Sequence, residues 1–302
     1  MAGLLDWDVA IYCVNEAGRL RGCLASVAAA LAGSAARISV ILNGSTDESI
    51  TIAREAAGSG APVAIFSIAT ADKSNAMNQF YYNICAPARA YAGVDGYVEV
   101  GPESFRAMQA HLQNNPHALA VTGVALNGRT MKLATEPTLR KGGQLHGPLH
   151  ALRPEFLDRM VARGIRQPFG LYCGDGLLCS MAAHDLDPIG TRWDDTRVQG
   201  VAEATYEIPA LSLFKPRDLQ RQYRREIRQM RGRIENAAIK SIIYTGGYEA
   251  LPASSFEMAR MYLAAHKLPP APVSRRLFQL LAVRSVDRGG MPAPERLLAR
   301  AV

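Results

Sequence analysis

Polar side chains of the kinds that bind ligands follow the first apolar segments of the chain. They come after residues 9–14, 38–42 and 63–68, and a carboxylate closes the segment that begins at residue 91. These side chains are Asn15 and Glu16, then Asn43, Ser45, Thr46 and Asp47, then Asp72, Lys73, Asn75 and Asn78, and finally Asp95. If the segments are parallel strands, these groups meet at the edge where an open α/β sheet binds its ligands.

Taken one by one, several of these residues have a structural explanation. Ser45 or Thr46 followed by acidic residues is a good helix start, and Asn75 could be another cap. Four polar endings in the same order as four strands are harder to explain by capping alone. We therefore expect a ligand site at this edge.

The elements that must position these groups alternate between strand and helix. Continuous apolar runs such as "VAIYCV" are typical of strands covered on both faces, and helical spacing of apolar residues follows them. This alternation predicts an α/β fold with a mostly parallel sheet flanked by helices. Residues 127–150 are rich in Gly, Pro and polar groups and predict a loop or short antiparallel strands.

Further helices are expected at 154–164 and just after Gly174. From about residue 214 the chain becomes Arg-rich and helical, and three prolines at 269, 270 and 272 precede a last helix at 274–284. We divide the chain into an α/β domain at 1–213, which carries the polar strand ends, and a basic helical extension at 214–302.

Composition restricts where the protein works. No stretch of about eighteen apolar residues appears, so we expect no transmembrane helix. The N-terminal residues lack the basic start of a signal peptide, and the five cysteines are an odd number without CxxC spacing. A reduced, cytoplasmic chain is the expectation.

The basic charge is concentrated in the C-terminal third. Residues 215–240 hold nine Lys and Arg against three Asp and Glu, whereas residues 1–214 hold seventeen against twenty. This asymmetry points to an anionic partner such as a membrane surface, a diphosphate or a nucleic acid. No nucleic-acid-binding module is visible, so no nucleic acid is expected.

Several common sites are absent from the sequence. It contains no G-x-x-x-x-G-K-[ST], no G-x-G-x-x-G after the first strand, no G-x-S-x-G and no H-E-x-x-H. His146 and His150 lie in "HGPLH", where Gly and Pro disfavour a shared helix face, so a loop pair without metal is favoured.

Four segments together resemble the nucleotide-sugar-binding half of family 2 glycosyltransferases with the GT-A fold. They are "VAIYCVNEAGRLRGCLASV", "ISVILNGSTDES", "KSNAMNQ" and "GVDGYVEVGPESFRAM". The similarity continues more loosely through "YCGDGLLCSMAAHDLDPIG" to about residue 233. It implies transfer of a sugar, with inversion, from a nucleotide sugar (UDP being the best guess) to a sugar or lipid-linked acceptor, with Mn²⁺ or Mg²⁺ on the diphosphate.

The resemblance also assigns residues. Asp175 would be the general base that accepts the proton of the acceptor hydroxyl, although a helix N-cap explains "GDG" almost as well. Asp95 would hold the metal. The donor would be bound or its pocket shaped by Asn15, Glu16, Asn43, Ser45, Asp47, Asp72, Lys73, Asn75 and Asp95, with Gln222 and Arg225 matching a Gln-x-x-Arg-Trp-like helix that here lacks the Trp.

Two positions depart from the family pattern. Asn43 stands where an Asp is common, which leaves the nucleobase open, and Tyr97 replaces the second carboxylate of the D-x-D motif. On an extended strand Glu99 is about 13 Å from Asp95, too far for one metal ion to bridge them unless the chain turns sharply. Asp95 could bind metal with few protein ligands, Asp175 or His184 could assist, or catalysis could be metal-free or absent.

The Arg-rich segment has apolar residues at spacings of three and four from Leu219 to Ile234, with arginines on the opposite face. It is either a solvated face of a packed helix, a surface for anionic membrane, or a source of arginines for the donor diphosphate.

Two alternatives to the glycosyltransferase hypothesis remain. A sugar nucleotidyltransferase of similar fold usually has a Gly-rich basic loop after the first strand, of which "NEAGRLRG" is a poor version. A protein that binds nucleotide sugars without turnover is the other alternative, because the D-x-D motif is incomplete.

Overall fold

The computed structural model of the chain describes residues 3–209 and 216–302. Within them, one mixed sheet has the strand order β5-β8-β6-β7-β4-β1-β2-β3-β9. The strands are β1 (Trp7–Cys13), β2 (Ala36–Asn43), β3 (Val63–Ile68), β4 (Tyr91–Asp95), β5 (Glu99–Val100), β6 (Ala120–Ala125), β7 (Leu149–Leu152), β8 (Val198–Glu207) and β9 (Arg300–Ala301). Pairs β1–β2, β2–β3, β1–β4 and β6–β8 are parallel, whereas β4–β7, β6–β7, β5–β8 and β3–β9 are antiparallel.

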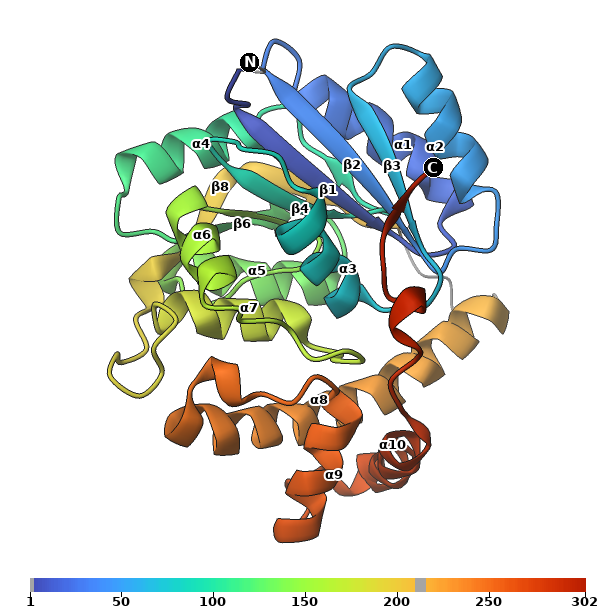
Figure 1. Cartoon of the computed structure of the whole chain (residues 1–302), viewed down its shortest axis with the longest axis vertical. Helices are drawn as coiled ribbons and strands as arrows, with labels where there is room; N and C mark the ends of the chain where they lie inside the picture. Colours follow the sequence, from blue (N-terminus) through green and yellow to red (C-terminus); the bar gives the residue numbers. More distant parts are fainter. Residues whose placement is uncertain (1–2, 210–215) are drawn as a thin grey trace.

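Helices cover both faces of this sheet (Figure 1). One face packs against α1 (Ala17–Ala30), α2 (Ser49–Gly58) and α4 (Ser104–Asn114), and the other against α3 (Lys73–Gln79), α6 (Pro154–Ala162) and α7 (Gly174–Ala183). Every residue of β1 is buried because this strand lies in the middle of both layers. The predicted α/β class with a mostly parallel sheet is confirmed.

The prediction of a loop or short strands at 127–150 is wrong for its first half. Residues Arg129–Lys141 form helix α5, which begins after Gly128 and ends at Gly142, both with positive φ. Pro137 lies inside this helix and hid it in the sequence. Packing decides the outcome here, since Thr135 and Thr138 are buried in the layer that α5 forms with β6 and β8.

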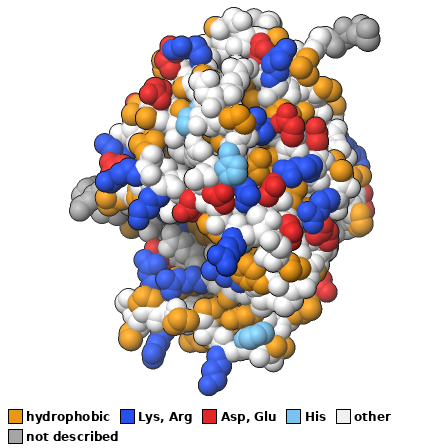
Figure 2. All heavy atoms as spheres, turned by 90° about the vertical axis from the view of Figure 1, so that its left-hand side faces the viewer, with side chains coloured by type: hydrophobic (Ala, Val, Ile, Leu, Met, Phe, Trp, Pro, Cys, Tyr) orange, Lys and Arg blue, Asp and Glu red, His pale blue; other side chains and the backbone are white. Residues whose placement is uncertain are grey.

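The C-terminal region is helical, as predicted, with α8 (Pro216–Gly246), α9 (Ser255–Ala265) and α10 (Arg276–Arg288). The expected domain boundary at 213/214 lies outside the described residues. The helices share a small core of Met230, Ile234, Ala259, Ala282 and Val286. In Figure 2 the lower part of the visible face, where these helices lie, shows mainly Lys, Arg and hydrophobic side chains. None of the described helices is long and apolar enough to cross a membrane.

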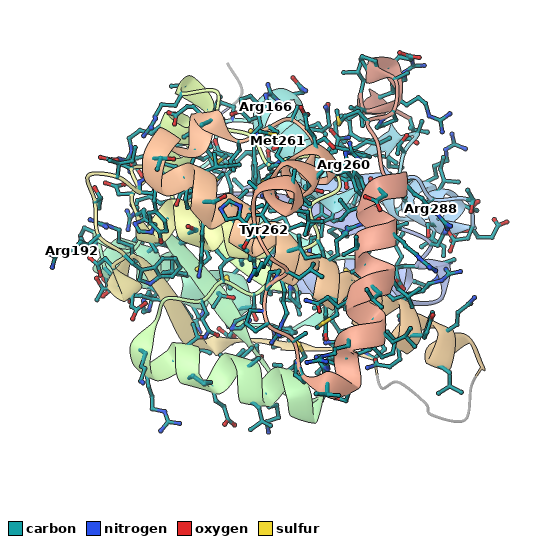
Figure 3. The ribbon with its side chains drawn as sticks, turned by 90° about the horizontal axis from the view of Figure 1, so that it is seen from below. Arg166, Arg192, Arg260, Met261, Tyr262 and Arg288 are labelled. Carbon is teal, nitrogen blue, oxygen red and sulfur yellow. The ribbon has the colours of Figure 1, made fainter. Side chains whose placement is uncertain are left out.

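A guanidinium fastens two of these helices together. Seen from below in Figure 3, Arg260 of α9 lies beside α10, and its Nη1 donates hydrogen bonds to the carbonyl oxygens of Val286 (2.9 Å) and Gly289 (3.0 Å). These carbonyls lie at the C-terminus of α10, where a positive charge is favourable, and that of Val286 also accepts from the amide of Gly289 at 3.2 Å. Arg260 therefore closes the end of α10.

The last residues of the chain return to the sheet. Strand β9 pairs antiparallel with β3, with Phe66 opposite Ala301 and Ser67 opposite Arg300. Just before it, Leu297 accepts a hydrogen bond from Asn75 at 2.8 Å through its carbonyl oxygen. The C-terminal segment thus lies across the start of α3, an arrangement that the sequence analysis did not predict.

Candidate functional site

The carboxylate of Asp95 is the centre of a polar cluster at the carboxyl end of β4. Its Oδ1 accepts a hydrogen bond from Nζ of Lys73, and its Oδ2 accepts one of 2.9 Å from the hydroxyl of Tyr97. Asp95 is buried, while the Lys73 side chain keeps 38% of its surface exposed. Both oxygens of the predicted metal ligand therefore have partners within the protein.

A tight turn after β4 brings Tyr97 back over Asp95. The amide of Val98 donates to the carbonyl of Asp95 at 3.0 Å, and the amide of Gly96 donates to the carbonyl of Tyr12 at 2.9 Å. A Cβ at Gly96 would lie only 3.1 Å from that carbonyl oxygen, so glycine permits the close approach of β4 and β1. The Asp95 carboxylate and the burial of Tyr97 raise the pKa of its phenol well above the usual value, so Tyr97 stays a hydrogen-bond donor.

The ammonium of Lys73 lies between two carboxylates. A Cβ at Gly147 would be 3.0 Å from Nζ of Lys73 and 3.2 Å from Oδ2 of Asp175, which places both groups around one point. Burial lowers the pKa of Lys73, but Asp95 and Asp175 outweigh it and the pKa is raised. Lys73 is therefore a permanent cation of the site.

Asp175 lies in the first turn of α7 and faces this cluster. Its Oδ2 accepts from the amide of Gly147 at 3.2 Å and its Oδ1 from the amide of Gly176 at 3.1 Å. The side chain is partly exposed, and Cys173, not Asp175, occupies the N-cap position of α7. The capping alternative for Asp175 is thus not what the structure shows, and its carboxylate is open to a ligand.

Two buried polar side chains behind the cluster were missed by the sequence reasoning. The ring of His150, on β7, lies over Gly93 of β4, and neither ring nitrogen has a hydrogen-bond partner in the described part of the chain. Burial and the charge of Lys73 lower the pKa of His150 to about 4, so it is neutral. The hydroxyl of Tyr206, on β8, is also buried without a described partner, and burial, Asp95 and Asp175 raise its pKa. His150 stood in the "HGPLH" motif, but it was assigned to a loop.

The polar residues after β1 and β2 hold two loops together. Asn15, with a φ of 52°, accepts from the amide of Thr46 at 2.7 Å, and Ser45 donates to the carbonyl of Cys13 at 3.2 Å. Asp47 accepts from the amides of Ala17 (2.9 Å) and Ser49 (3.1 Å), which start α1 and α2. Glu16 pairs with Arg19 at 3.5 Å. These predicted donor residues therefore shape the edge of the sheet beside β1 and β2.

The residues after β3 have a similar positioning role. Asn43 accepts from the amide of Asp72 at 2.9 Å, and Asp72 in turn accepts from the amides of Asn75 (2.7 Å) and Gly170 (2.8 Å). Burial raises the pKa of Asp72 to about 6 although both backbone hydrogen bonds oppose it. Asp72 thereby caps α3 and fixes Lys73, its chain neighbour, toward Asp95.

Helix α8 packs against the loop that leads to Asp175. Arg231 donates to the carbonyl of Gly170 at 2.7 Å and pairs with Glu235 at 3.1 Å, and Glu235 accepts from the amide of Tyr172 at 3.0 Å. The guanidinium carbon of Arg228 lies 5.6 Å from the centre of the Tyr172 ring.

The two residues of α8 that were predicted to bind the donor differ in their surroundings. Gln222 donates to Glu226 of the same helix at 3.3 Å. Arg225 acts electrostatically on Tyr172, and neither Arg225 nor Arg228 forms an ion pair with another described residue. Among the described residues, both guanidinium groups thus lack an ion-pair partner, and both act on Tyr172.

The residues present do not fit a protein-held metal ion. Among the described residues, no group of three or more His, Cys, Asp and Glu side chains is arranged to hold one. Glu99 lies on the α1 side of the sheet, since a Cβ at Gly22 would be 2.8 Å from its Oε1. His184 bonds through Nδ1 to the carbonyl of Thr191 and packs between Trp193 and Tyr244. Neither side chain completes a site with Asp95.

The sheet and its flanking helices form a GT-A-like fold, which solved glycosyltransferase structures share. The sequence comparison agrees: the family model described as Glycosyl transferase family 2 matches residues 8–174. The chain belongs to this family, as the resemblance in the sequence indicated. Among curated proteins no match is found.

Solved structures of the same fold include three glycosyltransferases. Mannosyltransferase PcManGT from Pyrobaculum calidifontis, in complex with GDP-Man and Mn²⁺, is 15% identical with a TM-score of 0.58, and 98% of this chain and 83% of that chain are covered. S. aureus TarS 1-349 in complex with UDP-GlcNAc is 12% identical (TM-score 0.54, 93% and 80% covered). Glucosyl-3-phosphoglycerate synthase from Mycobacterium tuberculosis, with Mn²⁺, UDP and glucosyl-3-phosphoglycerate, is 17% identical (TM-score 0.51, 72% and 75% covered). At these identities the likeness concerns the fold.

Proposed function

We propose that this protein transfers a sugar from a nucleotide sugar to an acceptor hydroxyl, with inversion at the anomeric carbon. The observation that carries the proposal is the placement of Lys73 and Asp175 around one point at Gly147, within a family 2 chain. A cation there can bind the diphosphate of the donor, while a carboxylate on the other side can accept the proton of the acceptor. Lys73 would thus bind the donor and Asp175 would act as the base, within the same site.

The reaction would proceed as a single displacement. The acceptor oxygen forms a bond to the anomeric carbon as the bond from that carbon to the diphosphate oxygen breaks, and the nucleoside diphosphate leaves with the electron pair. Asp175 accepts the hydroxyl proton from the face opposite the leaving group, which inverts the centre. His150 cannot replace Asp175 as base because it is fully buried and its ring faces Gly93.

The nucleoside is proposed to lie against the loops after β1, β2 and β3, with UDP as the donor nucleotide. Asn43 uses its Oδ1 for the amide of Asp72, so its side-chain NH₂ is the group that can face a base oxygen. Solved structures of this fold contain both guanosine and uridine nucleotides, since PcManGT was solved with GDP-Man and TarS with UDP-GlcNAc. Comparing uridine and guanosine nucleotides is therefore part of the test.

The acceptor is proposed to be a sugar or lipid-linked molecule brought to the site at an anionic membrane surface on the cytoplasmic side. Leu219 and Tyr223 lie on the apolar face predicted for α8 and are 52% and 49% exposed, and among the described side chains of this helix full burial begins at Met230. Exposed apolar side chains beside arginines suit a peripheral contact with anionic lipid. We propose no nucleic-acid partner.

The experiment is calorimetry with UDP, GDP, ADP and CDP, followed by a donor and acceptor screen that measures nucleotide release. Binding of one nucleoside diphosphate and its release from the matching sugar donor would support the proposal. Binding without release from any pair would favour a protein that holds nucleotide sugars without turnover. Pyrophosphate release from a nucleoside triphosphate and a sugar phosphate would instead indicate a nucleotidyltransferase, and no nucleotide binding at all would overturn every nucleotide-based function.

A further inference from the structure

The cation of this site is supplied by the chain itself. In the described residues, the one ion pair of Asp95 is with Lys73, whose ammonium contacts Oδ1 directly. A metal ion bound to that oxygen would need the same position, and two cations cannot share it without strong repulsion. The second oxygen accepts from the hydroxyl of Tyr97 at 2.9 Å.

No other described side chain completes a metal site here. Glu99 lies against α1 on the opposite side of the sheet, and His184 is bound to Thr191 away from Asp95. Divalent cations of this class need several oxygen ligands at about 2.0 to 2.6 Å. One carboxylate that is already in contact with an ammonium does not provide them.

The chain places its own positive charge beside the remaining carboxylate of the motif. Tyr97 removes one negative charge from the motif, and its hydroxyl donates to the carboxylate that remains. The ammonium of Lys73 contacts that carboxylate and also acts on Asp175. Asp95 therefore has a cationic partner that comes from the chain itself.

The ammonium also keeps unused hydrogen-bond donors. The Lys73 side chain is 38% exposed, and of its three N–H donors only the bond to Asp95 is present among the described residues. Arg225 and Arg228 add positive charge near Tyr172, three residues before Asp175. The ammonium can thus form charge-assisted hydrogen bonds to a diphosphate, with further positive charge on the side of the Asp175 loop.

We propose that the Lys73 ammonium takes the place of the divalent cation, so that the protein binds the diphosphate of its donor and releases the nucleotide without a metal ion. Asp95 and Tyr97 are then positioning residues, which hold the ammonium and shield the carboxylate. This inference rests on the proposed function, since it concerns the same donor.

The test measures the affinity of the wild-type chain for UDP and GDP in EDTA and in Mn²⁺ or Mg²⁺, alongside nucleotide release from the matching donor. We expect the affinity and the rate to agree within about twofold in all three conditions. Lys73→Met, which keeps the length of the side chain and removes its charge, should weaken binding about tenfold or more, because hydrogen bonds between charged partners contribute most to such contacts. Lys267→Met, on an exposed segment away from the site, is the matched control and should bind as wild type.

The outcomes separate this inference from the function beneath it. Binding that appears only with metal ions, with Lys73→Met indistinguishable from wild type, would overturn the inference and leave the glycosyltransferase proposal standing. Absence of nucleotide binding in every condition would overturn both. Thermal unfolding of each variant shows whether it is folded, and Lys73→Arg, which keeps the positive charge, should retain more metal-independent binding than Lys73→Met.

Discussion

The hydroxyl of Tyr97 donates a 2.9 Å hydrogen bond to Oδ2 of Asp95, two residues earlier in the chain. The residue that interrupts the D-x-D motif therefore interacts with the remaining carboxylate. Tyr97 and Lys73 together donate hydrogen bonds to both carboxylate oxygens of Asp95, so the altered motif satisfies its own carboxylate.

Replacing Tyr97 tests this unit. Tyr97→Phe should lower the free energy of unfolding by about 1 to 2 kcal/mol, because a buried carboxylate oxygen loses its partner. Tyr97→Asp should make nucleotide affinity depend on Mn²⁺, because a second carboxylate restores the ligands that a divalent ion needs. Denaturant unfolding and calorimetry measure the two effects. If the nucleotide affinity of Tyr97→Asp does not depend on Mn²⁺, the missing carboxylate at this position is not what prevents metal binding.

Asp175→Asn should separate binding from transfer. The amide cannot accept the acceptor proton, so we expect the rate of nucleotide release to fall about 100-fold or more, while the affinity for the nucleoside diphosphate changes by about twofold at most. Asp158→Asn, an exposed position on α6, is the control and should transfer as wild type. Unchanged turnover in Asp175→Asn would assign the base to another group.

His150 should make the protein less stable as the pH falls. Its pKa is about 4 in the folded chain, against 6.5 for an ordinary His, because of burial and the neighbouring Lys73. Below pH 6.5 the imidazole is protonated in the unfolded chain, whereas in the folded chain it stays neutral down to about pH 4. The contribution of His150 to the free energy of unfolding is therefore fully present above pH 6.5 and is lost as the pH falls from 6.5 to 4. The shift corresponds to roughly 3 kcal/mol.

The measurement compares the free energy of unfolding of wild type and His150→Leu between pH 4 and 7. Asp72, whose pKa is raised to about 6 by burial, acts in the opposite direction in both proteins, so it cancels in the difference. As the pH falls, the free energy of unfolding should decrease less in His150→Leu than in the wild type. Parallel pH profiles would contradict the assignment to His150.

The C-terminal segment should support the donor site from outside. Its hydrogen bonds reach Asn75 (2.8 Å), Thr70 (3.2 Å) and Gln79 (3.3 Å) around α3, and β9 extends the sheet beside β3. Removal of residues 291–302 should lower the free energy of unfolding by about 2 kcal/mol or more, given about 1 kcal/mol for each lost bond.

Truncation should also weaken nucleotide binding, because α3 begins with Lys73. Calorimetry of the truncated chain checks this. The matched control is Arg300→Ala, which removes an exposed side chain but keeps the backbone pairing of β9. Full affinity after truncation would show that the segment is dispensable for the site.

The sequence by itself determined the strands and the order of the polar residues that end them. Alternating apolar runs and helical spacings are local signals, so the class of fold could be predicted from them, and the resemblance of the motifs predicted the family. The same local signals failed at residues 129–141, where Pro137 and two flanking glycines hid a helix that packing stabilises.

Only the tertiary structure decided how these residues combine. Lys73 and Asp95 are 22 residues apart, and their contact depends on β4 lying beside β1 and on Asp72 capping α3. His150 and Tyr206 come from strands β7 and β8, and their burial near the charged groups has no signature in their own segments. Charge pairing, desolvation and a shifted pKa depend on distances between distant parts of the chain, and these distances exist only once the chain has folded.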